Sequence, residues 1–123
     1  MFDSFIKTEK SGKEIKTLDR EAVSQWIKDE VDLQFFIGDH PYKITVWGAL
    51  PEFTKDGKMK YNPRKHTSIF LKSGWDKCQT HLFTLKMFTL FAEKINEIQT
   101  KLNEYYDWLD QAFETVEDKD LSC

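Results

Sequence analysis

The sequence predicts an α+β domain: a twisted antiparallel β-sheet with an N-terminal helix and a long C-terminal helix. Three observations lead to this expectation. Short apolar segments bounded by turn residues are typical of strands. Apolar residues at helical spacing follow Asp19. No glycine or proline occurs after Gly74, which favours one long continuous helix at the end of the chain. The length, 123 residues, suits a single domain.

The N-terminal part predicts a hairpin followed by a helix. Residues 2–7 and 13–17 are expected to be the two strands of the hairpin. Thr17 or Asp19 can cap a helix over about residues 19–30. The apolar residues of this helix recur at helical spacing and predict one buried face, so its tryptophan is expected in the core: Ala22, Val23, Trp26, Ile27 and Val31.

Three further segments are expected to form strands, at about residues 33–37, 42–49 and 64–71. Side chains alternate between the two faces of a strand, so Lys43 and Trp47 should share one face of the second segment. The third segment has apolar residues at both odd and even positions. Its pattern therefore leaves open which face is buried.

The C-terminal segment predicts a helix over about residues 75–113, the end of a single domain spanning residues 1–113. Its apolar residues alternate at spacings of three and four, which is typical of a coiled-coil seam. We expect a homodimer or higher oligomer formed through this seam, with a helix that folds back on its own domain, broken near Asn103, as the alternative. The residues predicted to contact another copy are Phe91, Ile95, Ile98, Leu102, Tyr105 and Leu109.

The last ten residues, 114–123, form an acidic tail with few apolar side chains. Such a tail is typical of a solvated chain end. It is expected to keep the protein soluble, to compete with DNA for the basic surface, or to contact other proteins, such as those of replication or recombination.

Charge is segregated along the chain. Residues 41–77 hold eight basic and three acidic side chains, whereas residues 1–40 and 78–123 are both acidic, with net charges of −3 and −5. A basic middle in an acidic protein indicates a local surface for anions. The alternative is that the lysines only make a hairpin soluble.

Catalysis is not favoured by the sequence. Cys78 and His81 lie three residues apart, with His66 upstream, but this falls short of the paired spacings that mark zinc sites. There is no glycine-rich phosphate loop. We therefore expect no enzyme activity, no metal and no cofactor.

The apolar runs are too short for a membrane span, and the first ten residues are too charged for a signal peptide. Two distant cysteines do not make a disulfide framework. These features predict a cytoplasmic protein.

Single-stranded DNA is the ligand that the basic middle favours. Binding a single strand requires cations for the phosphates and exposed aromatic rings for the bases. The expected positive charge lies on strands and their connection, not on a helix that could read a major groove. The predicted DNA-binding residues are Lys43, Trp47, Phe53, Lys55, Lys58, Lys60, Tyr61, Arg64, Lys65 and Lys72.

A family resemblance points the same way. Residues 43–46, 53–60 and 63–65, followed by Ser68-Ile69 and Trp75, resemble the single-stranded DNA-binding domain of the transcriptional coactivator family called positive cofactor four. The resemblance covers about 35 of the 123 residues. It implies a curved antiparallel sheet, a homodimer assembled through helices, and single-stranded DNA held on the sheet and loop surface.

The resemblance also assigns positions. Lys58 and Lys60 match the basic residues around the family's turn, Arg64 and Lys65 match its basic pair, and Phe53 lies near its aromatic residue. A chain of this size would suit a bacteriophage or bacterial protein, which in the phage case would act in the host cytoplasm.

The sequence therefore predicts largely sequence-independent binding of single-stranded DNA in replication, recombination or transcription. Two alternatives stay open. One is a protein-interaction module that uses the heptad helix, and the other is a regulator that binds double-stranded DNA through the sheet.

Overall fold

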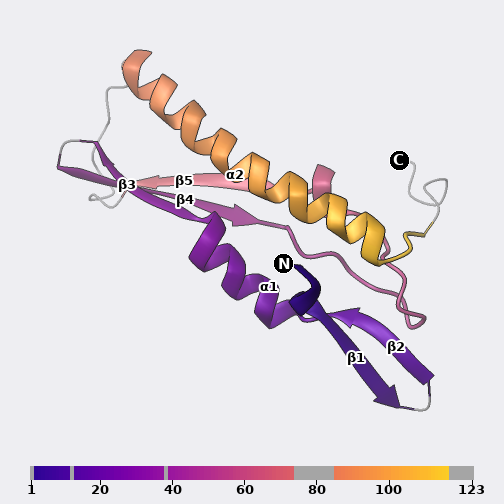
Figure 1. Cartoon of the computed structure of the whole chain (residues 1–123). Helices are drawn as coiled ribbons and strands as arrows, with labels where there is room; N and C mark the ends of the chain where they lie inside the picture. Colours follow the sequence, from indigo (N-terminus) through magenta and orange to yellow (C-terminus); the bar gives the residue numbers. More distant parts are fainter. Residues whose placement is uncertain (1, 12, 38, 74–84, 117–123) are drawn as a thin grey trace.

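The computed structural model describes residues 2–11, 13–37, 39–73 and 85–116. Figure 1 shows two sheets, a short helix α1 and a long C-terminal helix α2. The chain is thus of the α+β class, as predicted. In order, its elements are η1 (Phe2–Phe5), β1 (Ile6–Ser11), β2 (Lys13–Leu18), α1 (Arg20–Trp26), η2 (Ile27–Val31), β3 (Leu33–Ile37), β4 (His40–Trp47), η3 (Pro63–Lys65), β5 (Ser68–Ser73) and α2 (Leu85–Ala112).

The strands form two antiparallel sheets rather than one. β1 pairs with β2 as a hairpin, and β3, β4 and β5 form a second sheet with β4 in the middle. In the hairpin, Ile6 is opposite Leu18. In the second sheet, Lys43 of β4 lies between Gln34 of β3 and Lys72 of β5.

Helix α2 lies against one face of the three-stranded sheet (Figure 1). The ring of Phe91 on α2 is 5.8 Å from that of Phe35 and 5.5 Å from that of Tyr42. Ile44 follows Tyr42 on the same face of β4 and is buried. We call the opposite face the open face. By the strand pairing it presents Gln34, Phe36, Lys43, Thr45, Trp47, Ser68, Phe70 and Lys72. The predicted alternation along the second and third strands is confirmed.

The first residues differ from the prediction. Residues 2–5 form a short 3₁₀-helix rather than the start of a strand. Residues three apart lie on the same side of such a turn, so Phe2 and Phe5 both reach one aromatic cluster. Their rings lie 5.3 and 5.7 Å from Trp26. Trp26 also lies 5.4 Å from Tyr105 of α2, so the predicted core position of this tryptophan is confirmed.

The predicted N-terminal helix is confirmed, with Asp19 as its cap. The Asp19 carboxylate accepts a hydrogen bond from the Ala22 amide at 3.2 Å. Thr17 is not the cap, since its hydroxyl donates to the Lys7 carbonyl across the hairpin at 3.2 Å. The last turn, η2, is a π-helix, and it ends where the Asp32 amide donates to the Ile27 carbonyl at 2.7 Å.

The connection from β4 to β5 is longer than predicted. It contains a tight turn, in which the Thr54 amide donates to the Lys58 carbonyl at 2.8 Å and Gly57 takes the left-handed conformation at φ 83°. The predicted strand at 64–71 begins only at Ser68, because Pro63–Lys65 form η3. The Asn62 side chain caps this short helix by accepting from the Arg64 amide at 3.0 Å.

Helix α2 is continuous, with no break near Asn103. The predicted first part of this helix, residues 75–84, lies outside the described residues. Of the six predicted contact residues, only Ile95 is exposed; five are buried within this chain, namely Phe91, Ile98, Leu102, Tyr105 and Leu109. The heptad spacing thus packs α2 onto its own domain. Assembly of copies stays a prediction, and it requires other residues.

The chain after α2 stays attached to the domain. The Met59 amide donates to the Glu114 carbonyl at 2.7 Å, and the Val116 amide donates to the Met59 carbonyl at 2.8 Å. The predicted tail therefore begins with three residues that belong to the fold. Its remainder, 117–123, lies outside the described residues.

None of the helices in the described ranges has the length and apolar character that a membrane span requires.

Candidate nucleic-acid groove

Two lysines lie side by side on the open face. Lys43 and Lys72 are direct cross-strand partners, with Gln34 on the far side of Lys43. Both lysines are exposed, and neither forms an ion pair within the described residues. Like charges directly opposite each other destabilise a sheet. An anionic ligand that binds both ammonium groups would remove this repulsion.

Aromatic rings flank the two lysines. Trp47 is 58% exposed and Phe70 is 49% exposed, and their rings meet edge to face at 5.8 Å. The indole Nε1 of Trp47 donates to the Thr45 hydroxyl at 3.2 Å, which helps to fix the ring. Phe36, at the other end of the open face, is 69% exposed. Exposed rings of this kind are platforms on which bases can stack.

Helix α1 and η2 form the wall of a groove beside the open face. Arg20, Ser24 and Lys28 recur every four residues, so they lie on one side of the helix, and all three line the groove. The Arg20 guanidinium donates to the Pro51 carbonyl at 2.8 Å, which orients it without neutralising its charge. Asp32 is the acidic residue of the lining, and its carboxylate accepts from the Val46 amide at 3.0 Å.

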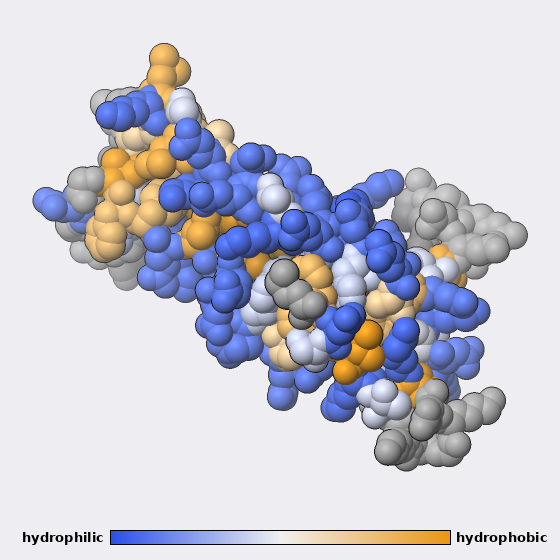
Figure 2. Space-filling view, viewed as in Figure 1, coloured by the Kyte–Doolittle hydropathy of each residue, from blue (hydrophilic) through white to orange (hydrophobic). Residues whose placement is uncertain are grey.

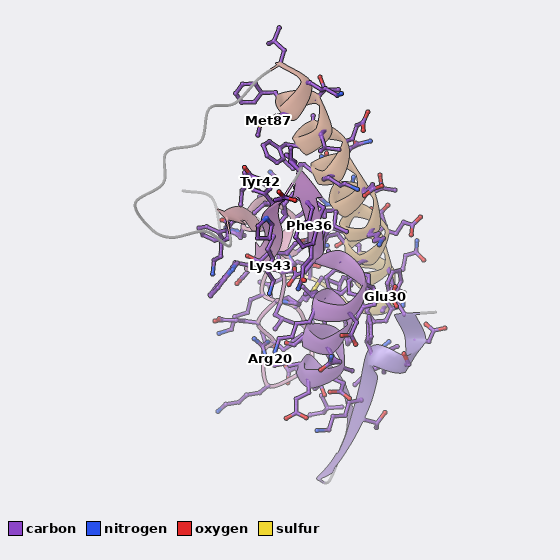
Figure 3. All side chains as sticks on the ribbon, turned by 90° about the vertical axis from the view of Figure 1, so that its left-hand side faces the viewer. Arg20, Glu30, Phe36, Tyr42, Lys43 and Met87 are labelled. Atoms are coloured by element: carbon purple, nitrogen blue, oxygen red, sulfur yellow. The ribbon has the colours of Figure 1, made fainter. Side chains whose placement is uncertain are left out.

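The groove has a volume of about 840 Å³ and extends along the open face. Its lining includes four basic side chains and one acidic side chain, with Trp47 beside them: Arg20, Lys28, Lys43 and Lys72 against Asp32. A smaller hollow of about 320 Å³ shares Lys43 and Lys72 with it and continues to Phe36. Figure 3 shows Arg20, Lys43 and Phe36 following one another along the molecule.

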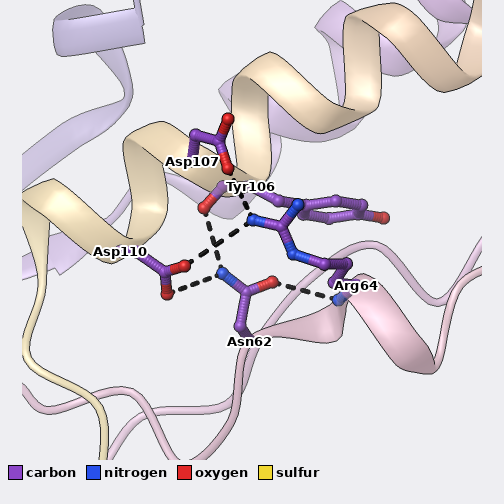
Figure 4. Close-up of polar contacts among 5 residues, drawn as sticks. All are labelled: Asn62, Arg64, Tyr106, Asp107 and Asp110. Atoms are coloured by element: carbon purple, nitrogen blue, oxygen red, sulfur yellow. Dashed lines mark hydrogen bonds and ion pairs between the residues drawn. The ribbon is translucent and has the colours of Figure 1, made fainter.

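A second group of predicted DNA-binding residues is engaged elsewhere. Figure 4 shows the contacts of Arg64 and Asn62 with the C-terminal half of α2. We call this group of contacts the clamp. The Arg64 guanidinium is 2.7 Å from the Asp107 carboxylate, 3.6 Å from that of Asp110, and lies over the Tyr106 ring. The Asn62 amide donates to the Tyr106 carbonyl at 3.0 Å and to Asp110 at 2.8 Å.

Other cations of the connection have weaker partners. Lys58 is 3.7 Å from Glu114, and Lys60 is 3.9 Å from Glu52, with all four side chains largely exposed. Such contacts offset the positive charge only in part. Lys55 and Lys65 are exposed and form no ion pair within the described part of the chain.

The two predicted aromatic residues of the connection are half-buried. The Phe53 ring meets Phe113 edge to face at 4.9 Å, and Tyr61 meets His66 at 4.8 Å. The pairing of Phe53 with Met59 folds the turn back onto the end of α2. The Phe53 ring is therefore used for packing. This position is less accessible to a base than that of Trp47.

The structure brings residues to the groove and the open face that sequence reasoning missed. Arg20, Lys28 and Gln34 line the groove, Phe36 lines the smaller hollow, and Phe70 lies on the open face. One signal was present: the alternation along the third predicted strand, continued to residue 72, places Phe70 and Lys72 on the same face. The others could be found only from the pairing of β3 with β4 and from the position of α1.

Two buried tyrosines hold the sheet to α2. The Tyr105 hydroxyl donates to the Ala49 carbonyl at 3.0 Å, just after β4, and the Tyr106 hydroxyl is hydrogen-bonded to Thr67, just before β5. Burial raises the pKa of Tyr105 far above its ordinary value, and the neighbouring Tyr106 adds to the effect. Burial also raises the pKa of Tyr106, against the lowering effects of the Thr67 hydrogen bond and of Arg64.

Glycine at position 48 allows the chain to leave β4 at this point. Gly48 has φ 78°, a conformation that favours glycine, and a Cβ there would lie 2.7 Å from the His66 carbonyl oxygen. The end of β4, and with it Trp47, is thereby held close to the start of β5.

Comparisons of the chain with protein-family models, curated proteins and solved structures give no match. The resemblance to positive cofactor four therefore stays a prediction. Within the described residues, no three His, Cys, Asp or Glu side chains converge as metal ligands would.

Proposed function

We propose that this protein binds single-stranded DNA in the groove between α1 and the open face of the β3–β4–β5 sheet. The observation that supports this most directly is Trp47, a ring 58% exposed in a groove lined by four basic side chains and one acidic one. Cations beside accessible aromatic faces are the combination that single strands require.

The two kinds of contact have separate places. Bases would stack on Trp47, Phe70 and Phe36, because these are the exposed rings of the open face. Phosphates would contact Lys43 and Lys72 on the sheet and Arg20 and Lys28 on the helical wall. Stacking and phosphate contacts both tolerate any base, so the binding would depend little on sequence.

A non-catalytic protein of this kind would act in replication, recombination or transcription, wherever single strands are exposed. Binding of duplex DNA is less favoured, because the exposed rings have no unstacked bases to receive in a duplex. The cytoplasm, including that of a host cell for a phage protein, is the compartment we propose.

A fluorescence titration with oligothymidylate tests this function. Stacking of a base on Trp47 should quench its emission on addition of the single strand, and duplex of the same length should compete poorly. The matched control is Trp47→Phe, which keeps an aromatic platform but removes this fluorophore. That variant should still bind, measured by anisotropy of a labelled oligonucleotide, with most of the quenching lost. Unchanged emission at saturating DNA would place the strand elsewhere.

A protein-interaction role is the second candidate. It is favoured by exposed apolar side chains on α2 and β5, among them Phe88 and Leu71, which are 57% and 44% exposed. Failure of any nucleic acid to bind, with a stable complex of protein chains, would favour this role.

A further inference from the structure

Strand β5 is an edge strand with an unusual composition. Within the described residues, no strand pairs with its outer edge. Its three central residues, Ile69, Phe70 and Leu71, are 37%, 49% and 44% exposed, so apolar groups reach solvent on both faces. Edge strands are normally protected by charges, proline or a cover. Apolar residues on both faces are typical of strands whose two faces are both covered, whereas both faces of β5 reach solvent in the single chain.

Helix α2 extends the apolar surface on the same side. Tyr106 contacts Thr67 beside β5, and Ile95 and Phe88 precede Tyr106 by 11 and 18 residues, close to three and five helical turns. They therefore lie on the β5 side of α2, and both are exposed.

We call Ile69, Leu71, Phe88 and Ile95 the β5 surface. Figure 2 shows apolar side chains gathered at the end of the molecule where the N-terminal half of α2 lies.

We propose that a second copy of this chain covers the β5 surface, with the two β5 strands paired antiparallel about Phe70. Ile69 would then be opposite the partner's Leu71, and Lys72 opposite the partner's Ser68. An antiparallel pair about a two-fold axis presents the same patch on both chains.

This register suits the sequence of β5 in two ways. It places apolar side chains opposite apolar side chains on the α2 side of the sheet. It also keeps the two copies of Lys72 from lying directly opposite each other, a placement that would be destabilising. Two other two-fold registers keep each side chain on its own face of the sheet, but each sets an apolar residue against a polar one. A pairing centred on Leu71 would place Ile69 opposite the partner's Ser73, and a pairing centred on Ile69 would place Leu71 opposite the partner's Thr67.

The assembly would complete the groove. The two sheets would join into one sheet of six strands, and Phe70 would lie beside the partner's Phe70 on the open face. Two grooves would then form one surface, so one single strand could contact both copies. This consequence rests on the proposed function, whereas the pairing of β5 does not.

Light scattering on a sizing column, without DNA, tests the pairing. The unchanged protein should be a dimer, and Ile69→Lys and Leu71→Glu should each be a monomer, because each places a charge in the apolar contact. Both positions are exposed in one chain, so these variants should fold, as circular dichroism will show. The control is Phe36→Lys, which replaces an exposed ring on β3, the other edge strand of the sheet. It should leave the dimer intact.

Mixing the variants tests the register. Ile69→Lys mixed with Leu71→Glu should restore the dimer, because the two new charges face each other at one contact and the other contact keeps its native pair. Ile69→Lys mixed with Ile69→Glu should stay monomeric, because positions 69 do not meet. A dimer in this second mixture, or in either single variant alone, would overturn the proposed pairing, as would an unchanged protein that is monomeric.

DNA titrations of the same variants separate this inference from the proposed function. The monomeric Ile69→Lys variant should bind a short oligonucleotide as the unchanged protein does and lose affinity for one long enough to contact both copies. If neither the unchanged protein nor any variant binds DNA, while the dimer and its register are confirmed, the proposed function is wrong and the proposed assembly is right. If the monomer binds long and short strands as well as the dimer does, the joined surface is wrong.

Discussion

The groove on the open face and the clamp on the α2 side of the sheet both contain cations from the basic middle of the sequence, but they use them differently. In the groove, Lys43 and Lys72 lie exposed beside Trp47. In the clamp, Arg64 is 2.7 Å from Asp107 and covers the Tyr106 ring. The first arrangement leaves positive charge for a ligand, and the second uses it to attach the connection to α2.

The difference shows what a basic segment in an acidic chain can mean. The acidic excess of residues 78–123 includes Asp107 and Asp110, and the fold brings part of the basic middle against them. Charge segregation along the sequence thus has two outcomes in one protein. A cation with an acid beside it has part of its charge offset, so the fold decides how much of each cation's charge stays available to a ligand.

The largest effect is expected from two aromatic side chains, Trp47 in the groove and Phe53 in the connection between β4 and β5. Truncation of one stacked ring costs roughly 1–3 kcal/mol, so Trp47→Ala should weaken binding of single-stranded DNA about 5- to 150-fold. Phe53→Ala should instead lower the free energy of unfolding, by less than the roughly 3–5 kcal/mol of a fully buried phenylalanine. Oligonucleotide anisotropy and urea unfolding measure the two quantities. Loss of affinity in Phe53→Ala but not in Trp47→Ala would place the stacked bases on the connection instead of in the groove.

High pH should act on the clamp side of the molecule. Burial raises the pKa of Tyr105 and Tyr106 in the folded chain, so both lose their protons less readily when folded than when unfolded, where a tyrosine ionises at about pH 10. Their contribution to stability is complete below that pH and is lost as pH rises further. While Tyr105 stays protonated in the folded chain the loss is about 1.4 kcal/mol per pH unit, and Tyr106 adds to it in the same direction.

Urea unfolding at pH 9 to 11.5 measures this dependence. Tyr105→Phe should be less stable at neutral pH, because the Ala49 carbonyl loses its donor, yet show a flatter decline above pH 10. The same alkaline slope in both proteins would mean that Tyr105 ionises in the folded state.

The lysines allow a matched comparison of salt dependence. Each phosphate contact on a single strand contributes roughly 0.7 to the slope of log affinity against log salt. Replacing Lys43 and Lys72 together by glutamine should therefore reduce the slope by roughly 1.4, without loss of stability. The control pair is Lys58→Gln with Lys60→Gln, whose ammonium groups lie near carboxylates, and its effect on the slope should be smaller. A larger effect in the control pair would move the phosphate path to the connection.

The smallest effect on binding is expected at Arg64. Arg64→Gln should leave DNA affinity and its salt slope unchanged, and lower stability by about 0.5–1 kcal/mol, because exposed ion pairs are weak. Asp107→Asn should give a similar loss, and the double variant should lose less than the sum. A double-mutant cycle from urea unfolding measures this coupling. Reduced DNA affinity in Arg64→Gln would show that the guanidinium is available to DNA despite its partners.

Local patterns in the sequence determined much of this protein. The α+β class, the helix after Asp19, the strand at 33–37 and the side-chain alternation around Lys43 and Trp47 all follow from residue order and periodicity. These features depend on neighbours within a few positions, and such neighbours are visible in a sequence.

Only the tertiary structure decided how those elements are used. A heptad spacing states that one face of α2 is apolar, but the same face can pack on another copy or on its own domain. Here Ile98 and Leu109 are fully buried in their own chain. Likewise, a lysine or an arginine has the same charge in the sequence whether or not an aspartate some 43 positions away lies beside it, as Asp107 lies beside Arg64. Contacts between distant parts of the chain arise from packing, which local sequence does not encode.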